Sequence, residues 1–114
     1  MEISFRDQKL ADMLKDDREL RKKFGRLAKN VQLRIDLLRQ ARTLAEVSHA
    51  PPPRRHRKKG TDKTFVIDVK TKKDKWRIEF DVANDPVPLK DDGGIDLNAV
   101  TAVEIVEISV HYGD

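Results

Sequence analysis

Side chains that can move protons or hold a phosphate come from three separate segments of this 114-residue chain. Cleaving RNA without a metal requires one group to accept the 2′-hydroxyl proton, a cation on the phosphate oxygens, and a group to protonate the leaving 5′ oxygen. Histidine, lysine, arginine and tyrosine can fill these roles. The chain offers such residues in a basic stretch, in a strand-like segment and near its end: Arg54, His56, Lys58, Lys59, Lys63, Arg77, His111 and Tyr112.

The basic stretch, PPPRRHRKKGTDK at residues 51–63, places six Lys or Arg residues around His56 after three prolines. Its plainest interpretation is a solvated charge run that links two halves of the chain. The sharper interpretation is a docking surface for RNA, with a histidine that takes part in chemistry. The candidate docking residues are Arg54, Arg55, Lys58, Lys59 and Lys63.

Charge is distributed unevenly along the chain, although the net value is only +4. Residues 54–77 carry 11 basic and 3 acidic side chains, whereas residues 78–114 carry 1 basic and 9 acidic ones. Folding does not require this separation, and it indicates that part of the surface meets a polyanion. Mutual neutralisation of basic and acidic side chains on neighbouring strands is an alternative that stays open.

Several classes of protein are disfavoured by composition. The chain has no cysteine, so a disulfide framework and a thiolate metal site are excluded. His49, His56 and His111 share no metal-ligand spacing, and we expect neither a metal nor a cofactor. No apolar run approaches the roughly 20 residues that span a bilayer, and the first residues lack a secretory signal. We expect one cytoplasmic domain, residues 1–114, without membrane contact.

The first half of the chain predicts a short strand at residues 2–5 and then helices. Asp7 is a suitable N-cap for a short helix. An apolar stripe at helical spacing predicts one amphipathic helix of at least five turns, slightly broken near Gly25. Its members are Leu20, Phe24, Leu27, Val31, Ile35 and Leu38. The capping-box spacing of Thr43 and Glu46 predicts a further helical turn.

The second half alternates with the period of strands. Residues 64–69 and 76–82 predict a hairpin, residues 84–99 a long loop, and residues 100–110 a central strand. The order β-α-α-β-β-β gives an α+β fold, with two N-terminal helices packed on a small, mostly antiparallel sheet. Arg77 alternates with the apolar residues, so it should lie on the face away from the helices. We expect that face to carry the basic residues.

Short patterns along nearly the whole chain resemble HigB-type toxins of the RelE/ParE superfamily. They are Ile3-Ser4-Phe5-x-Asp7-x-Lys9-Leu10, Ala41-x-x-Leu44, Pro-Pro-x-Arg-x-His at residues 51–56, Gly60, Trp76-Arg77-Ile78-x-Phe80 and Val103-Glu104-Ile105. The family usually ends its last strand in Asp-Tyr-His. Here the corresponding residues are Val110, His111 and Tyr112.

The resemblance implies a RelE-like fold and the toxin component of a type II toxin–antitoxin system. Such a toxin binds the ribosome and cuts mRNA without a metal, is neutralised by a HigA-like antitoxin, and meets operator DNA only through that antitoxin. The implied catalytic residues are His56, Arg77, His111 and Tyr112. A ParE-like gyrase inhibitor that cuts no RNA and a binding-only homologue are the alternatives.

Overall fold

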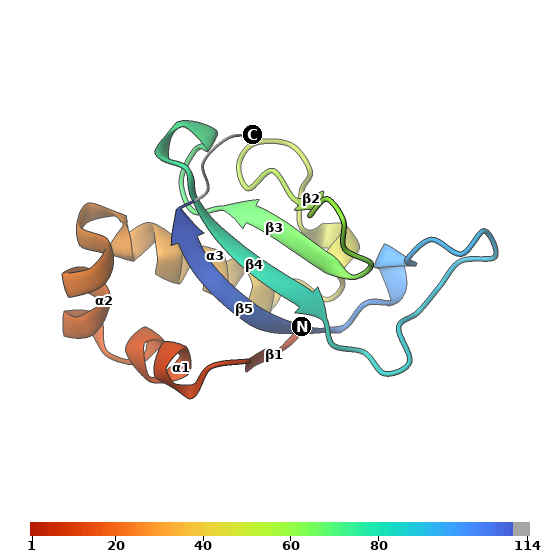
Figure 1. Cartoon of the computed structure of the whole chain (residues 1–114), viewed down its shortest axis with the longest axis horizontal. Coiled ribbons are helices and arrows are strands. Elements are labelled where there is room, and N and C mark those ends of the chain that lie inside the picture. The colour runs from red at the N-terminus through yellow and green to blue at the C-terminus, as the bar shows by residue number, and fades with distance from the viewer. Residues whose placement is uncertain (111–114) are drawn as a thin grey trace.

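The computed structural model of the chain describes residues 1–110, and it is an α+β structure as predicted (Figure 1). A five-stranded sheet has the order β1-β5-β4-β3-β2. The strands are β1 (Glu2–Phe5), β2 (His56–Arg57), β3 (Thr64–Asp68), β4 (Trp76–Val82) and β5 (Ala102–Val110). Only the β1–β5 pair is parallel, so the expected mostly antiparallel sheet with a central last strand is confirmed.

Three α-helices precede the main sheet: α1 (Gln8–Leu14), α2 (Asp17–Phe24) and α3 (Ala28–Gln40). Short 3-10 turns follow at η1 (Gly25–Leu27), η2 (Leu44–Glu46), η3 (Lys72–Asp74) and η4 (Leu97–Ala99). Figure 1 shows α3 crossing behind the sheet, while the opposite face carries no helix. The core between α3 and the sheet contains the fully buried Val31, Ile35, Phe80 and Ile105.

The predicted break near Gly25 is confirmed, but it is complete, so the single long helix predicted from the apolar stripe is wrong. Gly25 has φ 56° and ψ −125°, a backbone conformation that side chains disfavour strongly. This residue ends α2, and α3 starts three residues later in a new direction. The apolar stripe continues across the break because both helices pack on one core, and so Leu20, Phe24, Val31 and Ile35 are all buried.

The N-terminal caps are formed by aspartates. Asp7 Oδ1 accepts from the Lys9 amide at 2.9 Å, which confirms the predicted cap of α1. Asp16 caps α2 in the same way. The turn at η2 also forms, but the predicted capping box is wrong. Thr43 makes no side-chain cap, and the Glu46 carboxylate accepts from the Arg42 amide instead.

The stretch at residues 51–63 is more than a linker, because it contributes an edge strand. In β2, His56 pairs with Val66 and Arg57 with Phe65 in an antiparallel register. The Lys58 amide extends this ladder by donating to the Thr64 carbonyl at 2.9 Å. The basic stretch is therefore fixed against β3, and its alternate side chains point to opposite faces of the sheet.

Residues 84–99 form a loop, as predicted, and the loop is closed at its base. The Asn84 side-chain oxygen accepts from the amides of Thr101 and Ala102 at 3.0 and 3.1 Å. Ile95 is buried and bridges to Leu89. In Figure 1 this loop extends away from the helices at the far right of the molecule.

Candidate functional site

The face of the sheet opposite α3 is polar, and strand register determines which residues it contains. Asp68 lies opposite Arg77, Val66 opposite Glu79, and Thr64 opposite Asp81. Each pair continues onto β5 as a row across the sheet: Ser109 lies opposite Arg77, Glu107 opposite Glu79, and Glu104 opposite Asp81. His56 extends the middle row onto β2, since it pairs with Val66. Segments far apart in the chain therefore meet on one surface.

Asp68 is the centre of one end of this polar face. Its carboxylate accepts from Arg54 Nε at 2.7 Å and from Arg54 Nη2 at 2.9 Å, a two-point pairing that fits the planar guanidinium. The Arg77 guanidinium lies 3.8 Å from the same carboxylate. Arg34 of α3 donates to the Asp68 backbone carbonyl at 3.0 Å. Burial lowers the pKa of Arg34, and attraction to Asp68 opposes part of that shift.

Arg77 lies on the predicted face, but it is not open to solvent. Only 3% of the residue is exposed, and Asp68 is equally buried at 2%. The Arg54 side chain, 21% exposed, is the more accessible partner of the shared carboxylate. Arg54 is therefore the guanidinium of this cluster that a molecule in solution can reach directly.

His56 is half-buried at the edge of the face, and one of its ring nitrogens is already engaged. Nδ1 lies 2.9 Å from the backbone carbonyl of Arg54. A carbonyl oxygen can only accept, so Nδ1 carries the proton in the neutral ring. The lone pair is then on Nε2, which is the atom left to accept a proton from another molecule.

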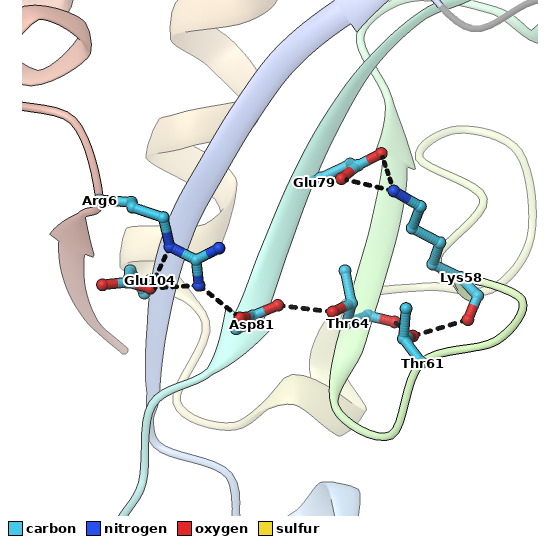
Figure 2. Close-up of polar contacts among 7 residues, drawn as sticks. All are labelled: Arg6, Lys58, Thr61, Thr64, Glu79, Asp81 and Glu104. Carbon is cyan, nitrogen blue, oxygen red and sulfur yellow. Dashed lines mark hydrogen bonds and ion pairs between the residues drawn. The ribbon is translucent and has the colours of Figure 1, made fainter.

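Lys58 follows His56 by two residues and points to the same face. Its ammonium lies 3.0 Å from Glu79 Oε1 and 3.1 Å from Oε2, as Figure 2 shows. The Lys58 side chain is 40% exposed whereas that of Glu79 is 10% exposed. The lysine therefore covers the glutamate and keeps its own outer surface in water.

A second network lies at the other end of the face (Figure 2). Arg6, just after β1, donates to Asp81 at 2.6 Å and to Glu104 at 2.8 Å. Hydrogen bonds to Glu104 and Asp81 raise the pKa of Arg6 above its ordinary value. The Thr64 hydroxyl donates to Asp81 at 2.6 Å. This network ties β1, β3, β4 and β5 together.

The remaining predicted docking residues separate into two groups. Lys59 and Lys63 are exposed on the connection between β2 and β3, as a docking role requires. Arg55 instead points away from the polar face and donates to the Leu44 carbonyl at 3.2 Å. Burial lowers the pKa of the Arg55 guanidinium, which favours a structural position for it. His111 and Tyr112 lie outside the described residues.

The expectation that this face is basic is wrong. The three main strands place five carboxylates on it: Asp68, Glu79, Asp81, Glu104 and Glu107. The cations Arg6, Arg54 and Lys58 reach over the face from its flanks and pair with four of these carboxylates, Asp68, Glu79, Asp81 and Glu104. The alternative of mutual neutralisation describes the face better, because the acidic residues of the last segments oppose the basic residues of the stretch at 51–63.

The polar partners of the candidate residues were not identified from sequence. In the sequence, Asp68 and Glu79 are polar residues that alternate with apolar ones, which does not show what they contact. The signal that identifies them is the register of the β3–β4 hairpin, since directly opposed residues share a face. Centring the hairpin on the turn at residues 70–75 places Asp68 opposite Arg77.

Comparison with known proteins gives no relative of this chain. No protein-family profile, curated protein or solved structure matches it. Within residues 1–110, no helix has the length and apolar character needed to cross a bilayer. Over the same range no three His, Cys, Asp or Glu side chains are grouped so that they could hold a metal ion.

Proposed function

We propose that this protein is the toxin of a type II toxin–antitoxin pair, a RelE-like, ribosome-dependent mRNA endonuclease of the cytoplasm. The observation that carries the proposal is the position of His56. Its Nε2 is unprotonated in the neutral ring, and the ring lies on the same face as Lys58 and the Arg54–Asp68–Arg77 cluster. The fold order, with helices between the first strand and an antiparallel sheet, is compatible with the sequence resemblance.

In the proposed reaction, His56 Nε2 accepts the proton of the 2′-hydroxyl as that oxygen attacks the neighbouring phosphorus. The bond from phosphorus to the 5′ oxygen breaks, and the products are a 2′,3′-cyclic phosphate and a 5′-hydroxyl. Lys58 and Arg54, which lie on the same face as His56, are the proposed cations for the phosphate oxygens. His111 and Tyr112 are the proposed donors of the proton to the leaving oxygen.

Arg77 is proposed to act on the phosphate through the shared carboxylate. It is buried, and it holds Asp68 from the side opposite Arg54. Approach of the singly charged RNA phosphodiester to Arg54 weakens the ion pair between Arg54 and Asp68, and Arg77 then retains the carboxylate. Lys59 and Lys63 are proposed to dock RNA. A HigA-like antitoxin, the ribosome and mRNA are the expected partners.

One observation favours a second candidate, a homologue that binds but does not cut. The polar face carries five carboxylates, and their negative charge repels an RNA backbone. The cations of the face can bind phosphates only after they are released from these carboxylates. A non-nucleolytic inhibitor, including a ParE-like one acting on gyrase, needs no proton-transfer groups at His56.

Induction of the protein in bacterial cells, followed by mapping of transcript 5′ ends, tests the proposal. The wild type should arrest growth and produce new 5′ ends in translated regions. His56→Ala should reduce cleavage by about 100-fold or more, the usual effect of losing a general base. His49→Ala is the matched control, because His49 is an exposed histidine that belongs to no strand of the sheet.

Three outcomes separate the candidates. Cleavage that survives in His56→Ala at the level of His49→Ala contradicts the assigned role of His56. Growth arrest with intact transcripts and accumulating DNA breaks indicates the gyrase inhibitor. Normal growth at high expression, with folded protein confirmed by circular dichroism, indicates the binding-only homologue.

A further inference from the structure

Half of β5 has no neighbouring strand on the side away from β4. The parallel partner β1 covers only residues 102–105, and the last bond of that ladder runs from the Arg6 amide to the Ile105 carbonyl. The chain then turns into α1. Within the described residues, nothing pairs with residues 106–110 along this edge, as Figure 1 shows. An uncovered strand edge is a template for an added strand.

A cavity of about 590 Å³ lies beside this edge, between β5, α1 and α2. Its apolar lining comes from Leu10 and Met13 of α1 and from Val106 and Ile108 of β5. Leu10, Met13 and Val106 are only partly buried, so they offer apolar surface to an incoming side chain. A strand that pairs with the edge would direct alternate side chains into this cavity.

The rim of the cavity is acidic. Asp7, Asp12, Asp16, Glu19 and Glu107 line it, against Lys9 and Lys23. All seven of these residues are exposed. This charge contrasts with the positive net charge of the chain, and it is complementary to a basic ligand.

Glu107 gives a second reason to assign a ligand to this edge. It lies directly opposite Glu79 on β4, and like charges in that position destabilise a sheet. Lys58 compensates Glu79, but Glu107 is exposed on the rim of the cavity. A cation that arrives with a ligand would compensate Glu107 as Lys58 compensates Glu79.

From the free edge, the apolar cavity and the acidic rim together, we infer that residues 106–110 bind an extended basic segment of a partner protein as a sixth strand. The segment alternates apolar side chains, which enter the cavity, with Lys or Arg side chains, which meet the acidic rim. At about 3.3 Å per residue, the free edge accommodates a segment of roughly five residues. This inference does not depend on the proposed nuclease activity.

The probe for this inference is a synthetic fluorescent peptide that alternates valine with lysine. Two control peptides have the same composition in scrambled order and glutamate in place of lysine. Fluorescence anisotropy should detect binding of the alternating basic peptide alone. Hydrogen–deuterium exchange should show slower exchange within residues 106–110 when it is bound, because the added strand takes up the amides that face the free edge.

Charge-reversal variants test the assigned surface. Glu107→Lys and Glu19→Lys should each weaken peptide binding by roughly tenfold. Asp91→Lys is the matched control, since Asp91 is an exposed acid in the distant loop, and it should bind as the wild type does. Because Glu107→Lys changes a strand, Glu19→Lys on α2 keeps the test valid if the first variant unfolds.

Three results would overturn the inference. If Asp91→Lys weakens peptide binding as much as Glu19→Lys does, the binding reflects general charge attraction and not the assigned surface. Peptide binding without slower exchange at residues 106–110 would place the ligand elsewhere. Concentration-dependent dimers in analytical ultracentrifugation, with the same residues protected, would make a second copy of this chain the occupant. Activity in the transcript assay has no bearing on any of these results.

Discussion

At the scale of single residues, Asp68 explains why the basic residues at the heart of the polar face do not behave as a free charge cluster. It is 2% exposed and is contacted by three arginines: Arg34 of α3, Arg77 of β4, and Arg54, which precedes β2. A buried cation is stable only when a partner offsets its lost hydration. The carboxylate of Asp68 therefore determines where Arg54 and Arg77 lie.

Asp68→Asn should destabilise the fold by about 3 kcal/mol, because it leaves the buried Arg77 without its nearby carboxylate. Urea unfolding monitored by circular dichroism, extrapolated to water, measures the change. Asp62→Asn is the control: Asp62 is exposed, and its substitution should stay within about 0.5 kcal/mol of the wild type. Equal stability of the two variants would contradict the central role given to Asp68.

At this scale the sequence predicted on which face of the sheet Arg77 lies, but it did not predict which residues contact Arg77. Alternation along residues 76–82 was enough to place Arg77 away from the helices. Its burial depends on Asp68 and Arg54, which reach it through the hairpin register and the β2 ladder. Those contacts are set by turn geometry and tertiary packing, and periodicity in one segment carries no information about them.

At the scale of elements, the apolar pattern predicted what is buried better than where each helix ends. The stripe from Leu20 to Leu38 is buried as expected, yet it belongs to two helices. The short strand β2 was also missed, because two residues beside three prolines give no alternation to detect. The long β5 was found because nine residues supply several periods.

Gly25→Ala should cost about 2 kcal/mol, because φ 56° with ψ −125° is strained for any residue with a side chain. An added methyl group at this position meets no heavy atom within 4 Å, so the cost is conformational rather than steric. Thermal unfolding by calorimetry measures it, with Lys29→Ala as the control at an exposed helical position. A Gly25→Ala melting temperature that equals that of the control would show that the helix break tolerates ordinary residues.

At the scale of the whole molecule, whose longest dimension is 45 Å, basic and acidic residues gather in separate patches. One end collects basic residues from α2, η1 and the β3–β4 turn, among them Lys23, Arg26, Lys70, Lys72 and Lys73. The edge-to-face contact of Phe24 with Trp76, with ring centroids 5.2 Å apart, brings these segments together. The acid-rich loop at residues 84–99 lies at the other end (Figure 1). A polyanion should therefore approach with its phosphates toward the basic end.

The triple variant Lys70→Ala, Lys72→Ala and Lys73→Ala tests that orientation. If each lysine contacts one phosphate of a single-stranded RNA, their loss should reduce the slope of log K against log salt concentration by about 2, since each contact contributes about 0.7. Anisotropy titrations of a labelled RNA oligonucleotide over a series of salt concentrations measure the slope. The control removes three exposed cations elsewhere, Arg39, Arg42 and Lys90, and should leave the slope close to that of the wild type. An equal loss in both triple variants would mean that RNA responds only to net charge, and the basic end would then have no special part in docking.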